Sequence, residues 1–281
     1  GGRPYLKGTV TSDNPAQFTA STVATSQKSI TMSGLASRYV IDDQAAEDSA
    51  VLAIPTLQRQ IVMDLNDAME DAIINGDSTA THQDDIANWN IRGRWGTSPA
   101  LGGSSDHRRG FVGLRAAAFD RSCTHDAGAP TYAFSDFLTA QSKLGEIGLM
   151  DLMAIVSPEM MVANLLSMSE VKTVDVFGPR ATILSGQLAS IAGVPIIMSR
   201  FMSADLNGNG LYDNVTKDKT GMLLVHRQSW RIFERRGILV ESQRKIDVGA
   251  TEIVATRRAK LDTLDLDDTK NVCFQFDLNI A

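Results

Sequence analysis

The chain lacks a cysteine framework, a membrane-length apolar run and the common catalytic signatures. Its only cysteines, Cys123 and Cys273, lie far apart in the sequence and predict no disulfide scaffold. No apolar run approaches the ~18 residues that a membrane-spanning helix needs. There is no G-x-S-x-G elbow, P-loop, H-E-x-x-H helix or C-x-x-C pair. These absences argue against an integral membrane protein and against the best-known enzyme classes, and so few cysteines fit a reducing compartment such as cytosol.

Positive charge is in deficit overall and unevenly distributed. The formal net charge of −6 at pH 7 argues against a protein that binds nucleic acid mainly through phosphates. Residues 1–80 carry five Lys/Arg against ten Asp/Glu, whereas residues 221–260 carry nine against four. Surfaces of opposite sign can pair across a contact between copies of one chain, although each can equally be a solvated face.

The first 77 residues predict three elements that would not be stable alone. Gly1–Asn14 reads as an extended arm, and its Gly1-Gly2 start looks like a processed terminus or an engineered remnant. Gln17–Met32 reads as two Thr/Ser/Ala-rich strands with almost no apolar face. An isolated hairpin of this kind is marginal in water. We therefore expect another copy of the chain to order it.

A strand and one long amphipathic helix follow. Leu35–Ile41 alternates like a strand, and Asp48-Ser49 offers an N-cap for a helix that runs to Asn75 and accepts Pro55 in its first turn. Gly76 is the expected C′ residue. The predicted apolar stripe comprises Leu57, Ile61, Leu65, Ala68 and Ala72, and the acids expected on the other surfaces are Asp64, Asp67, Glu70 and Asp71.

The rest of the chain predicts an irregular connection followed by mixed helices and strands. Residues 78–130 read as one long loop. Ser135 and Ser157 are the expected caps of two helices, with Pro158 in the first turn of the second. The predicted strands are Met153–Val156, Leu188–Arg200, Met222–His226, Trp230–Phe233, Ile238–Glu241, Glu252–Leu261 and Val272–Ile280.

Three sets of residues offer chemistry, and a structural role is the favoured interpretation of each. Asp205–Asp213 resembles a calcium loop, but Thr216 stands where a bidentate carboxylate is needed, so a polar turn is favoured. The spacing of His107, Cys123 and His125 matches no compact zinc motif. The arginine pairs could contact phosphate, but ion pairing with neighbouring subunits is favoured; they are Arg108-Arg109, Arg235-Arg236 and Arg257-Arg258. We expect no cofactor, metal or catalytic residue.

Taken in order, four stretches resemble the major capsid proteins of tailed bacteriophages, whose fold is named after phage HK97. Each stretch is weak alone, and their common order carries the resemblance. They are Tyr39–Ser49 (strand into spine helix), Ala72–Asp77 (end of that helix), Leu188–Ser199 (part of the axial domain) and Glu252–Leu278 (closing strands).

The resemblance implies an α+β, HK97-like capsid fold with five parts. These are an N-terminal arm (1–16), an extended loop lying over a neighbouring subunit (17–41), a peripheral domain with the spine helix at about 48–75 (42–131), an axial domain (132–221) and closing strands shared by both domains (222–281). Lys28 lies near the loop tip, but Thr251–Arg258 lacks the Asn and Glu pair that cross-linking chemistry would need. A non-covalent shell is therefore expected.

The implied function is a structural major capsid protein without enzymatic activity. It would self-assemble into hexamers and pentamers of an icosahedral phage head in the host cytoplasm, and the virion would enclose double-stranded DNA without sequence-specific contact. Portal, scaffold or maturation protease and decoration protein are possible partners, and no membrane is involved. The residues expected at subunit contacts are Phe18, Lys28, Arg38, Asp42, Asp43, Arg235, Arg236, Arg257 and Arg258.

Two alternatives stay open. An encapsulin-type nanocompartment shares the fold, although that family usually begins with a helix and Gly1–Asn14 looks extended. A metal-dependent soluble enzyme would have to use the His107, Cys123 and His125 region or the Asp205 loop.

Overall fold

The computed structural model describes residues 28–48, 53–79, 82–89, 105–128, 132–168, 171–172, 187–265 and 269–280. The predicted arm, most of the predicted hairpin and Phe18 lie outside the described residues. The chain divides into a unit of Gly1–Ile30 and a unit of Thr31–Ala281. Every helix and strand below belongs to the second unit.

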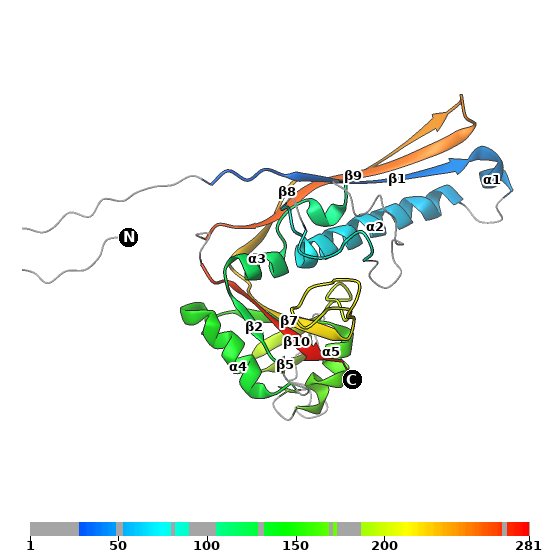
Figure 1. The fold of residues 1–281 in the computed structure, drawn as a ribbon. Helices are drawn as coiled ribbons and strands as arrows, with labels where there is room; N and C mark the ends of the chain where they lie inside the picture. Colours follow the sequence, from blue (N-terminus) through cyan, green and yellow to red (C-terminus); the bar gives the residue numbers. More distant parts are fainter. Residues whose placement is uncertain are drawn as a thin grey trace, which may run out of the picture. The chain divides into compact units, whose positions relative to one another are not determined.

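A three-stranded antiparallel sheet is built from β1 (Ser33–Asp42), β9 (Ala250–Thr263) and β8 (Trp230–Lys245), in the order β1-β9-β8. Figure 1 shows β1 running along the long β8–β9 hairpin. The strands predicted at Leu35–Ile41 and Glu252–Leu261 are confirmed. The two strands predicted within 230–241 are wrong in one respect, because they form one strand of 16 residues. Its register shifts on both sides of Arg236, so the polar Glu-Arg-Arg-Gly run makes a β-bulge without ending the strand.

The long helix α2 (Ala53–Asn75) packs on one face of this sheet (Figure 1). The predicted start at Asp48 is wrong. Asp42 caps a separate short helix α1 (Asp43–Glu47) by accepting a hydrogen bond from the backbone N of Gln44 at 2.8 Å, and Asp48 is the C-cap of that helix. Pro55 does lie in the first turn of α2, where it blocks no helical hydrogen bond.

The predicted stripe of α2 faces the core. Ile61, Leu65 and Ala72 are buried, and Leu57 and Ala68 are half-buried. One expected surface acid is placed differently, because Asp71 is fully buried. A buried carboxylate needs charged or hydrogen-bonded partners, and the charged partners of Asp71 lie on a segment more than 30 residues away in the sequence, as described below.

Gly76 ends α2 for a different reason from the one predicted. Its φ is not positive, so it is not a left-handed C′ residue. A Cβ at Gly76 would lie 2.3 Å from the carbonyl oxygen of Ala72 and 2.5 Å from that of Phe111. Gly113 is equally crowded, since its Cβ would lie 2.6 Å from the Gly76 nitrogen. The two glycines let the end of α2 and the start of α3 (Leu114–Asp120) touch through their backbones.

A seven-stranded sheet forms the other layer, in the order β2-β10-β7-β3-β6-β5-β4. Its strands are β2 (Thr124–Asp126), β3 (Leu152–Val156), β4 (Val171–Lys172), β5 (Gln187–Ile191), β6 (Val194–Met198), β7 (Lys219–His226) and β10 (Val272–Asn279). The strands predicted at Met153–Val156 and Val272–Ile280 are confirmed within one residue, and the strand predicted at Met222–His226 begins three residues earlier, at Lys219. The β-rich segment predicted at Leu188–Arg200 forms two antiparallel strands, β5 and β6, separated by a turn. The runs Met153–Val156 and Met222–His226 are neighbours, since β3 pairs with β7.

Short helices accompany this sheet: α4 (Phe134–Lys143), α5 (Pro158–Ala163) and the 3-10 turns η3 (Gly145–Leu149) and η4 (Leu165–Ser167). Ser157 caps α5 as predicted, because its Oγ accepts a hydrogen bond from the Met160 nitrogen at 3.0 Å. The predicted cap at Ser135 is wrong. Ala133 is the N-cap of α4, and its backbone N donates to Asp136.

The connection expected to be irregular between residues 78 and 130 contains the 3-10 turn η2 (His107–Arg109), helix α3 and strand β2. Residues Leu114 to Ala118 of α3 are all buried. One hydrophobic core joins α2 and the three-stranded sheet to α3 and to parts of β7 and β10, and a second lies among α4, α5 and the seven-stranded sheet. Among the described helices, none is long and apolar enough to cross a membrane.

Candidate subunit interface

A buried ion pair fixes the end of α2 to two loops. The Arg115 guanidinium of α3 donates to both carboxylate oxygens of Asp84 at 3.1 Å and to the Asn75 side chain at 2.7 Å. It also donates to the Gly210 carbonyl at 2.7 Å. Arg115 and Asp84 are 0% and 3% exposed. The pair therefore has no access for a ligand and serves to brace the fold.

Aromatic contacts extend this brace. The Trp89 and Tyr212 rings stack at a centroid distance of 5.1 Å, and the Tyr212 backbone N donates to Asp84 at 2.8 Å. Arg108 lies 5.5 Å from the Trp89 ring and donates to the Trp89 carbonyl at 3.1 Å. Arg108 is only 1% exposed and bridges to Asp106 at 2.9 Å. The expected intersubunit or phosphate role of Arg108 is therefore wrong, because its partners lie inside the chain.

His107 pairs with the buried acid of α2. Its Nε2 lies 2.8 Å from Asp71 Oδ2, and Asn75 donates to the other oxygen at 2.7 Å. Burial alone would raise the pKa of Asp71, but the His107 hydrogen bond and charge, with Arg108 nearby, hold it below the ordinary value. A cavity of about 370 Å³ lies beside His107, between β1, α2 and residues 105–110. It contains no catalytic triad among the described residues.

The residues considered for zinc are held by separate partners. His107 pairs with Asp71, and His125 lies 3.9 Å from Asp136. Cys123 donates to the Lys143 carbonyl at 3.6 Å. The Phe274 nitrogen donates to the Cys123 carbonyl at 3.0 Å, so Cys123 and Cys273 are buried free thiols on neighbouring segments of the sheet. Among the described residues no three His, Cys, Asp or Glu side chains are grouped as metal ligands.

In the loop considered for calcium, side-chain oxygens accept hydrogen bonds from backbone nitrogens of the same loop. Asn207 Oδ1 accepts from the nitrogens of Asn209 and Leu211 at 2.9 and 3.1 Å. Asp213 Oδ1 accepts from the nitrogens of Val215 and Thr216, and these bonds together with one from Asn207 lower its pKa. Such bonds are typical of a polar turn.

The outer face of the three-stranded sheet, on the side away from α2, is open among the described residues. Residues opposite each other in antiparallel strands share a face. Arg38 with Val254, and Gly34 with Arg258, are such opposite pairs, and both pairs lie on this outer face. Val40 of β1 and Leu239 of β8 are 55% and 42% exposed on this face. This face carries four of the contact residues expected from the sequence: Arg38, Asp42, Arg236 and Arg258.

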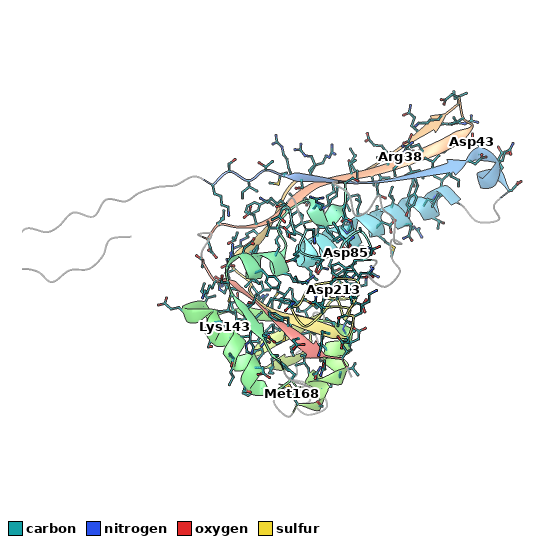
Figure 2. The ribbon with its side chains drawn as sticks, in the orientation of Figure 1. Arg38, Asp43, Asp85, Lys143, Met168 and Asp213 are labelled. Atoms are coloured by element: carbon teal, nitrogen blue, oxygen red, sulfur yellow. The ribbon has the colours of Figure 1, made fainter. Side chains whose placement is uncertain are left out.

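One end of this sheet, beside α1, is rich in carboxylates. Asp43 pairs with Arg244 at 2.9 Å, and Glu252 pairs with Arg38 and Lys245. The hydrogen bond from Lys245 and the nearby Arg38 lower the pKa of Glu252. Figure 2 shows Asp43 beside α1 at this end. Four exposed acids have no ion-pair partner among the described residues, and we call them the carboxylate end: Asp42, Glu47, Asp48 and Asp247.

Cations gather where β1 begins, partway along β8 and β9. Arg236 of β8 stands directly opposite Arg258 of β9 at the bulge, with Arg235 beside it. All three are exposed, and we call them the arginine cluster. Arg236 donates to Thr256 at 2.8 Å, but none of the three has an acidic partner among the described residues. Arg257 points to the opposite face, where it pairs with Glu234 at 2.8 Å and contacts Asn66 of α2.

The structure thus brings Arg38, Asp42 and Asp43 onto one sheet with Arg235, Arg236 and Arg258. It separates Arg257, which serves within the chain, and Lys28 belongs to the first unit of the chain. Sequence reasoning missed Glu47, Asp48 and Asp247. The signal was available as an Asp/Glu cluster at 42–48, but only the β8–β9 turn places Asp247 in the same sheet.

No protein-family model and no curated protein matches the chain. Solved shell structures match its fold. The holo-SrpI encapsulin complex from Synechococcus elongatus PCC 7942 is 13% identical, with a TM-score of 0.56 over 89% of this chain and 75% of that chain. A capsid chain of an empty GTA particle is 16% identical, with a TM-score of 0.52 over 94% and 81%. A chain of the satellite phage P4 procapsid is 10% identical, with a TM-score of 0.50 over 98% and 87%. The chain therefore has the α+β fold of phage capsid and encapsulin subunits, which confirms the expected HK97-like fold.

Proposed function

We propose that this chain, which has the HK97 fold, is a structural major capsid protein that self-assembles into the hexamers and pentamers of an icosahedral phage head. One observation supports this most directly: the fold likeness extends over about nine-tenths of the chain, and the matched chains come from a capsid and a procapsid. The head would enclose double-stranded DNA without sequence-specific contact. The subunit itself would have no enzymatic activity.

In this proposal the parts of the chain keep the boundaries expected from the sequence. Residues 1–16 form the arm, 17–41 the extended loop, 42–131 the peripheral domain, 132–221 the axial domain and 222–281 the closing strands. Residues 33–41 of the extended loop are strand β1, which pairs with β9. The free part of the loop is therefore proposed to be 17–32, and to lie over a neighbouring subunit.

Subunit contacts would use edges and charges in place of a large apolar patch. A contact between two different surfaces of the same chain closes into a ring when the rotation permits. The residues proposed at such contacts are Phe18, Lys28, Arg38, Asp42, Asp43, Arg235, Arg236 and Arg258. Assembly in the host cytoplasm, a virion location, and portal, scaffold or maturation protease and decoration partners belong to the same proposal.

The experiment is to express and purify the full chain and to examine it by sedimentation velocity and negative-stain electron microscopy. We expect closed icosahedral particles that contain nuclease-protected DNA when assembled in cells with a phage packaging system. A chain that stays monomeric under every assembly condition would rule out a shell function.

An encapsulin-type nanocompartment is the second candidate, favoured by the fold match to the holo-SrpI complex. It predicts particles of one size that contain a co-purifying protein and no DNA. Mass spectrometry of the particle contents separates the two shell functions. Stoichiometric metal retained after dialysis would instead favour the metal-dependent enzyme.

A further inference from the structure

Unpaired charges of opposite sign lie at two places along the three-stranded sheet. The arginine cluster lies beside the start of β1, partway along β8 and β9, and the carboxylate end lies beside the end of β1. Gly34, opposite Arg258, and Asp42, opposite Ala250, are eight residues apart along β1. At about 3.4 Å per residue, roughly 27 Å separates the two groups.

The arginine cluster is unfavourable in an isolated subunit. Arg236 and Arg258 face each other across neighbouring strands, and directly opposed like charges destabilise a sheet by up to about 1 kcal/mol. The bulge adds Arg235 to the same site. Three guanidinium groups without an acid among the described residues provide a binding site for carboxylates or phosphates.

The two groups cannot neutralise each other within one copy. Their separation of roughly 27 Å is several times the screening length of about 8 Å at physiological ionic strength. The carboxylate end of one copy can, however, reach the arginine cluster of the next if the sheets lie head to tail. Every copy then uses both of its charged groups.

A nucleic acid fits the same observations less well. Phosphates would pair with the arginine cluster but would leave Asp42, Glu47, Asp48 and Asp247 without a partner, and the whole chain carries a net charge of −6. The carboxylate end also exposes two apolar side chains in the β8–β9 turn, Ile246 at 85% and Val248 at 62%. A protein partner can bury these, whereas a phosphate backbone cannot.

We propose that the carboxylate end of one copy docks on the arginine cluster of a neighbouring copy, in a head-to-tail contact between the three-stranded sheets. The proposal rests on the proposed shell function, because it names the residues of one subunit contact. The occupant of each site is a second copy of this chain. The contact is electrostatic, so it is expected to weaken with salt.

The test uses charge reversal and charge exchange. Arg235→Glu/Arg258→Glu changes the formal charge of the cluster from +3 to −1, and Glu47→Lys/Asp48→Lys/Asp247→Lys changes that of the carboxylate end from −4 to +2. These five side chains are exposed and make no hydrogen bond or ion pair with the described residues. We expect each reversed variant to lower particle yield at least about tenfold at about 50 mM salt, because like charges then meet. Circular dichroism confirms that each variant is folded.

Restoration makes the test specific. The combined variant, with all five substitutions, exchanges the signs of the two groups, and we expect it to assemble again. A mixture of the two reversed variants should also associate, since each supplies the charge that the other needs. The matched control, Arg59→Glu/Lys270→Glu, makes the same change of charge as the cluster variant at exposed sites elsewhere and should assemble normally.

Three results would overturn the contact: cluster reversal that assembles as well as the control, exchange that does not restore assembly, or cluster reversal that loses only packaged DNA. The last would identify a phosphate site. If the wild-type chain forms no particles but the two reversed variants associate in pairs by sedimentation, the contact stands and the shell function fails. If particles form regardless of these charges, the shell function stands and the contact fails.

Discussion

Replacing Arg115 with methionine tests whether the buried ion pair holds the α2 end, the 82–89 loop and the Gly210 loop together. Methionine keeps much of the side-chain volume but leaves the buried Asp84 carboxylate without its cation. It also removes the donors to Asn75 and to the Gly210 carbonyl, which lie at 2.7 Å. Only the Tyr212 backbone N then still donates to Asp84.

The expected cost is about 4 kcal/mol in the free energy of unfolding. Removing one partner of a buried ion pair typically costs about 3–5 kcal/mol, because a charge is left buried and unpaired. The Nε of Arg115 is buried without a hydrogen-bond acceptor among the described residues, which already lowers the stability that Arg115 contributes. We therefore do not expect a cost at the upper end of that range. Adding Asp84→Asn removes the stranded charge, and the double variant should recover about 2 kcal/mol.

Urea unfolding of the unassembled chain, followed by circular dichroism, measures these values and closes a double-variant cycle. Arg227→Met is the control, since its pair with Asp151 at 3.3 Å is exposed and should cost less than about 1 kcal/mol. A cost below about 1 kcal/mol for Arg115→Met would refute the bracing role. So would a double variant whose cost equals the sum of the two singles.

Three other predictions follow from the same region. Gly76→Ala should lower the unfolding free energy by about 2–3 kcal/mol, while Gly34→Ala, with open space around its Cβ, should change it by less than about 0.5 kcal/mol; equal urea midpoints would contradict the close backbone contact. Burial lowers the pKa of His82 below its ordinary 6.5, so the unfolded chain takes up a proton first and stability should fall as pH drops below about 6.5. His82→Asn should flatten that slope in urea midpoints measured from about pH 7 to about pH 5, and an unchanged slope would assign it to another group. The lowered pKa of Asp71 gives stability that is present above pH 3.8 and lost as pH falls through the pKa of the folded state. On acidification, the Asp71→Asn variant should therefore lose less stability than the wild-type chain, as measured by circular dichroism. Identical acid-unfolding profiles would refute the role of the buried carboxylate.

Much of the fold could be predicted because its signals are local. The stripe of α2, the proline in its first turn and the Ser157 cap are set by residues three or four apart, and all three are confirmed. The HK97-like order of elements was also readable, since each strand is an apolar run bounded by turn residues. Boundaries were less secure, as the false start of α2 at Asp48 shows.

The charged interior could not be predicted, because its partners are distant in sequence. Arg115 meets Asp84 from 31 positions away and Gly210 from 95. The residues that flank Arg115 in the sequence do not distinguish a buried arginine from a solvated one. Arg108 shows the cost of that ambiguity, since it was expected at a surface and is 1% exposed. The need for glycine at position 76 could not be predicted for the same reason, because part of the backbone that a Cβ would contact there belongs to the sequence-distant Phe111.

The two kinds of charge in this chain have different consequences for assembly. The ion pairs of Arg108 and Arg115 are satisfied within the subunit, so they fix its shape before any neighbour is present. The arginine cluster and the carboxylate end are exposed and unpaired among the described residues, so in the proposed head-to-tail contact their interaction energy is gained between copies. Exposed pairs gain little individually, about 0–1 kcal/mol each. In the proposed shell, a contact built from such pairs would be weak alone and would become strong by repetition around a closed ring, so misplaced subunits could dissociate before the shell closes.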